Sequence, residues 1–163
     1  RMLKEIGLFD EDFFLLYEDV DLSFRAQLRN YRCLYVPEAR VYHKASSSIV
    51  HDSPISVYYS HRNLEWVYLK NMPAGLIRKS IIPHMIYNVA ACLYFLGSGR
   101  ILEFVRAKHH ALKGLKTVLQ KRRNIQKNCA VDEVYIWQLL EKERFYPRLT
   151  LRFRRNNRSR KKG

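Results

Sequence analysis

The feature that most constrains the fold is the stretch of residues 81–96, the most hydrophobic part of this 163-residue chain. It is shorter than the roughly 20 apolar residues that a helix needs to cross a bilayer. It also contains Pro83, His84 and Asn88, and polar side chains are costly inside hydrocarbon. The stretch therefore predicts a buried or interfacial helix, and we do not expect a protein with several membrane-spanning helices.

The charge is distributed unevenly along the chain. The formal net charge is +15, yet residues 1–75 carry nine Lys and Arg against ten Asp and Glu. Residues 76–127 carry eleven basic residues against one acidic residue, and residues 128–163 carry ten against four. A basic surface of this kind indicates an anionic membrane or nucleic acid as the partner. Because the aromatic residues are concentrated in the neutral front, nucleic acid is not expected.

The cysteines indicate the redox environment of the protein, and the first residue bears on whether the chain is a fragment. Cys33, Cys92 and Cys129 are odd in number and widely spaced, which indicates neither a disulfide framework nor a zinc site. They fit a reducing, cytoplasmic environment. The chain begins at Arg1, so we expect a fragment whose N-terminal part lies outside this sequence.

The first 43 residues predict alternating helix and strand. Apolar residues at helical spacing, among them Phe24 and Leu28, predict a helix over residues 19–29, with Asn30 as its C-terminal cap. Residues 31–36 and 39–43 are rich in β-prone side chains and predict two short strands. The expected fold class is therefore α/β.

The rest of the chain predicts helices. Ser53 and the proline after it open a helix to about residue 70, with Arg62 and Asn63 in its middle. A long basic amphipathic helix follows residue 99, which indicates either an anionic leaflet or packing on the chain's own domain. A further helix is expected over residues 131–140, and a disordered basic tail over residues 148–163.

Four residues are candidates for chemistry. Glu18, Asp19 and Asp21 place three carboxylates at a helix start, where clustered negative charge favours proton uptake by a general base. The alternative is that they only cap and solvate the helix, which composition alone favours. His43, at the end of a predicted strand, is either a metal ligand or a satisfied core residue.

The first 43 residues contain an ordered series of motifs. They are Gly7-Leu8-Phe9-Asp10-Glu11, Phe13-Phe14, Tyr17-Glu18-Asp19-Val20-Asp21-Leu22, Arg25, Tyr31, Val36-Pro37, Ala39, Val41 and His43. This series resembles the end of the catalytic domain of family 2 glycosyltransferases, most closely the rhamnosyltransferase-like branch, which builds bacterial cell-surface polysaccharides. The resemblance implies the C-terminal part of a GT-A (Rossmann-like) domain over residues 1–75, followed by a helical, basic, membrane-associating extension over residues 76–147.

The resemblance also implies roles for individual residues. Asp19 would be the catalytic base that deprotonates the acceptor hydroxyl in an inverting displacement. His43 would help to hold Mg²⁺ or Mn²⁺ on the donor diphosphate, where the metal stabilises the leaving group. Acceptor binding would fall to Glu18, Asp21, Arg62 and Asn63, and Arg25 would brace the helix.

The function implied is transfer of a sugar such as rhamnose from a nucleotide-diphospho-sugar to a polyprenyl-diphosphate-linked saccharide. Such an enzyme would work at the cytoplasmic face of the plasma membrane, as a peripheral protein on an anionic surface. We expect this fragment to be inactive by itself, because donor binding needs the missing half. The alternative is a non-enzymatic basic module that binds anionic membrane or nucleic acid.

Overall fold

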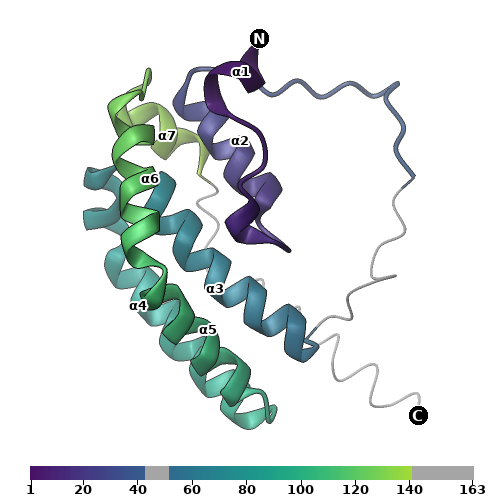
Figure 1. Cartoon of the computed structure of the whole chain (residues 1–163), viewed down its shortest axis with the longest axis vertical. Helices are drawn as coiled ribbons and strands as arrows, with labels where there is room; N and C mark the ends of the chain where they lie inside the picture. Colours follow the sequence, from purple (N-terminus) through teal and green to yellow (C-terminus); the bar gives the residue numbers. More distant parts are fainter. Residues whose placement is uncertain (43–51, 141–163) are drawn as a thin grey trace.

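The computed structural model describes residues 1–42 and 52–140, and every regular element in this part of the chain is a helix (Figure 1). Two short segments come first, helix α1 and the 3₁₀ turn η1, and six longer helices follow. Their bounds are Met2–Ile6 (α1), Glu11–Phe13 (η1), Glu18–Leu28 (α2), Pro54–Asn71 (α3), Ala74–Gly97 (α4), Ile101–Lys113 (α5), Leu115–Lys127 (α6) and Glu133–Leu139 (α7).

The predicted α/β class is wrong for the described residues, which contain no strand. Residues 31–42 run as an irregular segment instead, and side chains such as Tyr35 and Tyr42 are exposed. A strand is stable only when a neighbouring strand takes up its backbone hydrogen bonds. No second strand is available among residues 1–42 and 52–140, so β-propensity alone does not order this segment. The GT-A (Rossmann-like) architecture is therefore not what these residues form.

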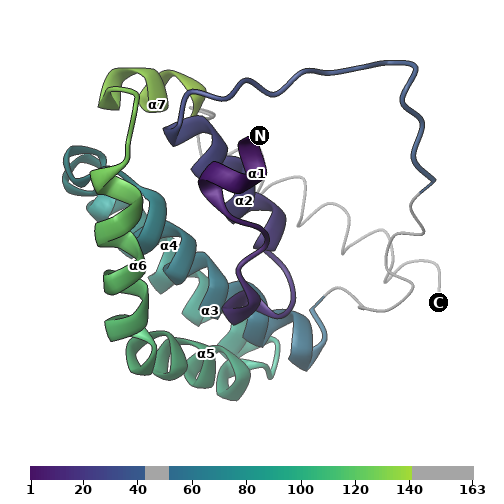
Figure 2. The ribbon, with the colours of Figure 1, turned by 45° about the horizontal axis from the view of Figure 1, so that its top comes forward.

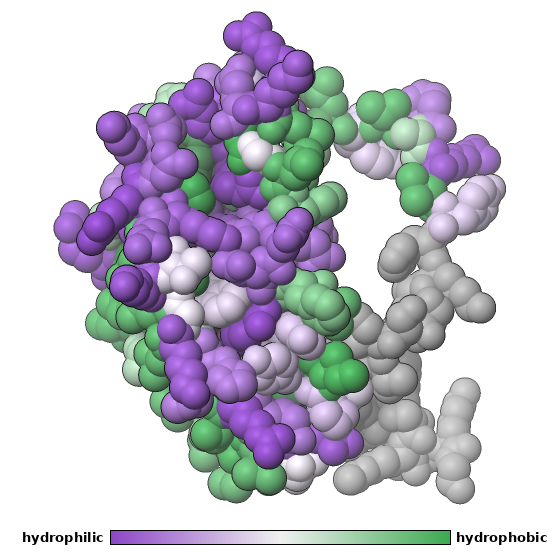
Figure 3. All heavy atoms as spheres, viewed as in Figure 1, coloured by the Kyte–Doolittle hydropathy of each residue, from purple (hydrophilic) through white to green (hydrophobic). Residues whose placement is uncertain are grey.

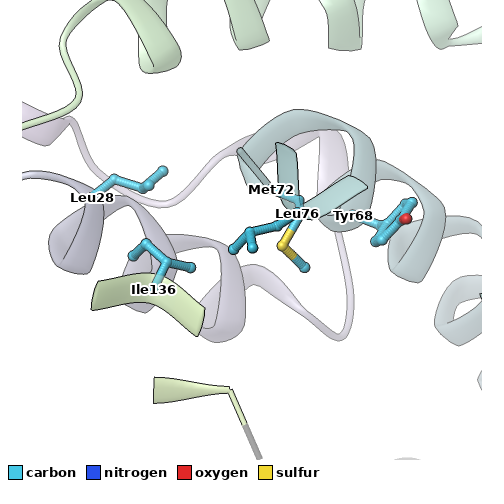
Figure 4. Packing of buried hydrophobic residues seen from close by; sticks show 5 residues of the cluster. All are labelled: Leu28, Tyr68, Met72, Leu76 and Ile136. Atoms are coloured by element: carbon cyan, nitrogen blue, oxygen red, sulfur yellow. The ribbon is translucent and has the colours of Figure 1, made fainter. Parts of the chain in front are cut away.

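Helix α3 is the element against which the others are arranged. It packs against α5, α6 and α2, and Figures 1 and 2 show it running between α2 and the α5–α6 pair. One core cluster joins α2, α3, α4 and α7, and its members come from both ends of the chain (Figure 4). These residues are Leu28, Tyr68, Met72, Leu76 and Ile136. A second cluster consists of Val57, Phe95 and Phe104.

The ends of α2 and α3 confirm the predicted caps. After α2, Asn30 adopts a left-handed conformation with φ 61°. The amide of Asn30 donates to the carbonyl of Gln27, and that of Tyr31 to the carbonyl of Ala26, which is the Schellman arrangement. Before α3, the hydroxyl of Ser53 accepts from the amide of Ser56 at 3.3 Å. Local sequence therefore sets both boundaries.

The basic region after residue 99 forms two helices where one long helix was predicted. The change of direction occurs at Gly114, between α5 and α6. A Cβ atom there would lie 2.5 Å from Cζ2 of Trp66, so only glycine lets α3 approach so closely. Phe104, Ala107 and Val118 are buried, and both helices pack on α3. This agrees with the second of the two interpretations, a basic helix packed on its own domain.

Helix α4 is longer than the predicted apolar stretch. It begins at Ala74 and ends at Gly97, with Pro83 inside it. At 24 residues it is long and apolar enough to cross a membrane, by length and composition only, and 6% of its apolar window is buried. The predicted helix is confirmed. Its predicted length is wrong, because residues 74–80 extend the helix at its N-terminal end.

Candidate active site at the start of helix α2

The three clustered carboxylates lie in different environments. Asp21 is fully buried, and both of its carboxylate oxygens are bound by protein groups. Oδ1 accepts from Nζ of Lys70 at 2.7 Å and from Nδ2 of Asn71 at 2.7 Å. Oδ2 accepts from Nε of Arg25 at 2.9 Å. Asp21 thus joins α2 to the end of α3, and its surroundings are protein rather than solvent.

The acidic turn before α2 is held by two lysines. Nζ of Lys70 lies 2.6 Å from Oδ2 of Asp10, and Nζ of Lys121 lies 2.6 Å from Oδ1 of Asp10 and 2.7 Å from Oδ2 of Asp12. Burial alone would raise the pKa of Asp10, but the ammonium groups of Lys121 and Lys70 outweigh it and lower the pKa to about 2. Asp10 is therefore a charged structural anchor between α3 and α6.

The segment between η1 and α2 has an unusual backbone. Phe14, Leu16 and Tyr17 all have positive φ, at 58°, 65° and 70°, a region that non-glycine residues rarely adopt. At Phe14 the chain makes a tight turn, in which the amide of Leu15 donates to the carbonyl of Phe13 at 2.6 Å. Such strain persists only where the surroundings hold it. Helix α2 begins at Glu18 directly after this segment.

Asn63 holds the strained turn from inside the protein. Its side chain is fully buried, and Nδ2 donates to the carbonyl of Phe13 at 3.0 Å and to those of Leu15 and Leu16 at 2.8 Å each. Arg62 supports the same turn from the neighbouring position, donating to the carbonyl of Phe13 at 2.9 Å. The structure thus brings these two predicted site residues to the base of the acidic cluster.

Two further contacts define the surroundings of Arg62. Its Nε donates to Oδ1 of Asn63 at 2.8 Å, which fixes the amide so that Nδ2 faces the turn. Its guanidinium also lies over the ring of Trp66, 4.3 Å from the centroid. The charge is therefore stacked on an aromatic face as well as hydrogen-bonded. The predicted contact of Arg62 and Asn63 with an acceptor stays a prediction.

Arg25 ties helix α2 to the start of the chain. Besides its ion pair with Asp21, its guanidinium donates to the carbonyl of Ile6 and, at 2.7 Å, to that of Leu8. Gly7 lies between them with φ 79°, a conformation that glycine adopts without strain. The guanidinium thus holds the loop after α1 against α2.

Asp19 and Glu18 are both less buried than Asp21. Asp19 is exposed, and its Oδ1 accepts from the amide of Val20 at 2.8 Å. Glu18 is half-buried, and within residues 1–42 and 52–140 its shielded Oε2 has no hydrogen-bond partner. Asp19 is therefore the member of the cluster that a substrate can reach.

A groove runs along α2 beside Asp19. Its volume is about 310 Å³, and its walls come from α2 and the C-terminal end of α7. The lining is mostly apolar, with three polar groups along one side. The lining residues are Asp19, Val20, Ser23, Phe24, Gln27, Ile136, Leu139 and Leu140. An exposed carboxylate at the edge of an apolar groove is an arrangement suited to binding a substrate.

The predicted metal ligand, His43, lies outside the described residues. Within the described ranges, no group of three or more His, Cys, Asp and Glu side chains is arranged to hold a metal ion. The Mg²⁺ or Mn²⁺ requirement stays a prediction, and no step of the proposal below depends on it.

Comparison with known proteins agrees with part of the predicted resemblance. The chain is 34% identical over 71 residues to the N-acetylglucosaminyl-diphospho-decaprenol L-rhamnosyltransferase of Mycobacterium tuberculosis, in both strain CDC 1551 / Oshkosh and strain ATCC 25618 / H37Rv. The match includes 44% of this chain and 23% of the relative, so it spans less than a quarter of the relative's length. No protein-family model and no solved structure matches the chain.

Sequence reasoning missed the lysines that neutralise the acidic cluster. Lys70 is 2% exposed and contacts both Asp21 and Asp10, although it lies 60 positions after Asp10 in the chain. A single lysine near the end of an aromatic-rich helix gives no sign of this. The pair Asp21 and Arg25 was detectable, since residues four apart on a helix are neighbours.

Proposed function

We propose that this chain is part of a sugar transferase in which Asp19 is the base that accepts the proton of the acceptor hydroxyl. The supporting observation is the separation of the acidic cluster into a buried structural carboxylate and an exposed one. Asp21 is enclosed by Lys70 and Arg25, whereas Asp19 faces a groove. A general base must come within hydrogen-bond reach of the proton that it removes, and an exposed carboxylate beside a groove is open to an incoming hydroxyl group.

The substrate class is proposed from the relatives. Their name specifies transfer of L-rhamnose onto N-acetylglucosaminyl-diphospho-decaprenol. By similarity, we expect a nucleotide-diphospho-sugar as the donor and a polyprenyl-diphosphate-linked saccharide as the acceptor. In the proposed step the acceptor oxygen forms a bond to the anomeric carbon, the nucleoside diphosphate leaves with the electron pair, and Asp19 takes the hydroxyl proton.

The strained turn gives Asp19 a fixed position. Three carbonyls of the segment that precedes α2 bind to one amide of Asn63, so the first turn of α2 is anchored to α3. A base held in place loses less freedom when the acceptor arrives, which lowers the barrier of the transfer step. Glu18, directly before Asp19, is proposed to receive a second hydroxyl of the acceptor on its carboxylate.

The test is transfer of radiolabelled L-rhamnose from nucleotide-diphospho-rhamnose to N-acetylglucosaminyl-diphospho-decaprenol, measured in membranes of cells that express the full-length transferase to which this chain is proposed to belong. Asp19→Asn keeps the size of the side chain and removes the base, so transfer should fall by a factor of about 10² to 10⁴. Glu11→Gln is the matched control, because Glu11 is an exposed carboxylate of the same acidic turn. It should retain wild-type transfer.

Donor binding separates a lost base from a lost fold. The full-length Asp19→Asn protein should bind the nucleotide-diphospho-sugar as the full-length wild type does, measured by calorimetry, and should show the same helical circular dichroism. Transfer by the Asp19→Asn protein at the wild-type rate would refute the assignment of the base. Transfer that falls equally in the Glu11→Gln protein would refute the special role of Asp19.

A further inference from the structure

Helix α4 carries an apolar face that the rest of the described chain does not cover. Six aliphatic side chains on this face are between 55% and 69% exposed. They recur every three or four positions, so they lie on one side of the helix and extend along it for about 21 Å. In Figure 3, apolar spheres follow the lower left edge of the molecule, where α4 lies in Figure 1. The six are Ile82, Met85, Ile86, Val89, Leu93 and Leu96.

The opposite side of α4 is fixed to the protein by polar contacts. Nε2 of His84 lies 2.8 Å from Oε2 of Glu65 in α3, and the other oxygen of Glu65 binds Lys108 of α5. Burial alone would raise the pKa of Glu65, but His84 and Lys108 lower it to about 2. Closer to the start of α4, the hydroxyl of Ser80 lies 3.0 Å from that of Tyr68.

These contacts disfavour a membrane-crossing orientation for α4 as it is packed here. If α4 crossed the bilayer, Glu65 and Lys108 would enter the hydrocarbon with it, and charged groups there are expensive. A helix with one apolar side and one side attached to a polar protein is instead suited to lie in the plane of the interface. In this orientation the side chains of the apolar stripe are buried in the membrane interface.

Positive charge lies at both ends of the apolar stripe. Arg78 occupies the stripe position one turn before Ile82, and both Arg78 and Lys79 are exposed. Arg100 follows four positions after Leu96. Residues 76–127 as a whole carry eleven Lys and Arg against one Glu. Cations beside an apolar surface match the phosphate layer that borders the hydrocarbon of an anionic membrane.

We propose that the outward face of α4 is a docking surface for an anionic lipid bilayer, with the helix parallel to the membrane and the side chains of the stripe in the interface. This inference goes beyond sugar transfer and does not depend on it, because it rests on the exposed stripe and its flanking cations alone. A protein that acts on a lipid-linked acceptor would gain from such a surface, since it would hold the protein at the membrane that carries the acceptor.

The test is partitioning of the purified chain onto large vesicles, measured by flotation. The wild type should float with vesicles that contain phosphatidylglycerol and should remain mostly in solution with pure phosphatidylcholine. Ile82→Gln/Ile86→Gln/Val89→Gln should weaken partitioning at least tenfold. The three side chains are exposed, so circular dichroism and urea denaturation should stay as in the wild type.

A matched control alters three exposed aliphatic residues elsewhere. Leu3, Leu34 and Val41 are exposed and lie outside α4, so Leu3→Gln/Leu34→Gln/Val41→Gln should change partitioning by less than twofold. For the charges, Arg78→Gln/Lys79→Gln should weaken binding to anionic vesicles by roughly thirtyfold, as expected when each of the two interfacial cations is worth about 1 kcal/mol. The matching charge control, Lys4→Gln/Arg32→Gln, should have a much smaller effect.

Three results would overturn the proposal. The first is partitioning that the α4 variant and the control variant weaken equally. The second is a protein that resists extraction by alkaline carbonate and has the two ends of α4 on opposite sides of the vesicle, which would show a spanning helix. The third is self-association in the absence of lipid that the α4 variant abolishes while vesicle binding persists, which would assign the stripe to a second copy of the chain.

Discussion

The ammonium nitrogen of Lys70 lies 2.7 Å from Oδ1 of Asp21, and neither residue is more than 2% exposed. This ion pair joins the middle of the acidic motif to the end of α3. It is completed by Asn71 and Arg25, which satisfy the rest of the carboxylate, and by Asp10, which shares the ammonium group. A buried charge is tolerable only when it is paired in this way. The acidic motif is therefore first an element of the fold.

Lys70→Met should strongly destabilise the protein. The methionine fills a similar volume, but Asp21 and Asp10 would each lose a buried cation. Removing one partner of a buried ion pair costs about 3–5 kcal/mol, which urea denaturation monitored by circular dichroism would measure. The control is Lys113→Met, at an exposed position of α5, which should cost less than about 0.5 kcal/mol. Equal stability of the two variants would contradict the role of the pair.

Asn63→Asp should destabilise the protein although the side chains have almost the same shape. At neutral pH an oxygen would replace the Nδ2 that donates to three carbonyls, so donors would be lost and a charge would face carbonyl oxygens. We expect a loss of about 2–4 kcal/mol in the free energy of unfolding. Asn124→Asp, at an exposed position of α6, is the control. An Asn63→Asp variant as stable as the wild type would show that the turn between η1 and α2 does not need the hydrogen bonds of Asn63.

The sequence predicted the helices well because their signals are local. The apolar spacing of α2, the cap formed by Ser53 and the left-handed Asn30 each depend on residues within one or two turns, and each is confirmed. The strands predicted for residues 31–36 and 39–43 are wrong over their described residues, 31–36 and 39–42, for the opposite reason. A strand depends on a partner from elsewhere in the chain, and residues 31–42 find none among the residues described.

The candidate site was only half visible in the sequence for a similar reason. Glu18, Asp19 and Asp21 stand out as a cluster, and the pattern alone does not say which of them is buried. Helical periodicity indicates that Asp21 shares a face with Arg25, and the structure confirms this pair. The enclosure of Asp21 also depends on Lys70, which only the folded arrangement of α2 and α3 brings close. The same packing of α2 and α3 leaves Asp19 exposed.

Stability should fall as the pH is lowered from about 4.5 to 2. The pKa of Asp10 is lowered from 3.8 to about 2, and that of Glu65 from 4.5 to about 2. A carboxyl group whose pKa is lower in the folded protein than in the unfolded chain stabilises the fold at pH values above its unfolded-state pKa. This stabilisation is lost as the pH falls through the folded-state pKa. Allowing for solvent screening, the two groups together should account for on the order of 3 kcal/mol.

Urea denaturation at pH 6, 4.5, 3.5 and 2.5 would measure this loss. Asp10→Asn should reduce the dependence of stability on pH over that range, because the group that takes up a proton on unfolding is gone. Glu11→Gln is the control, since Glu11 is an exposed carboxylate next to Asp10, and should leave the dependence as in the wild type. If Asp10→Asn and the wild type have the same slope, the lysines do not stabilise the charge of Asp10.

Gly114→Ala should destabilise the junction between α5 and α6. The new methyl group would lie 2.5 Å from Cζ2 of Trp66, and the indole cannot move away freely, because its Nε1 donates to the carbonyl of Ala111 at 3.1 Å and Arg62 stacks on it. Overpacking of this kind costs about 1–3 kcal/mol.

Gly97→Ala provides the matched comparison for that substitution. Gly97 is the last residue of α4, and a Cβ atom there would have no heavy atom within 4 Å. Since alanine restricts the unfolded chain more than glycine and favours helix, this variant should be more stable than the wild type by about 0.4–1 kcal/mol. The two substitutions are chemically identical, so opposite signs in urea denaturation would attribute the loss at Gly114 to its contact with Trp66. If both variants were stabilised, α5 would not approach α3 as closely as the structure shows.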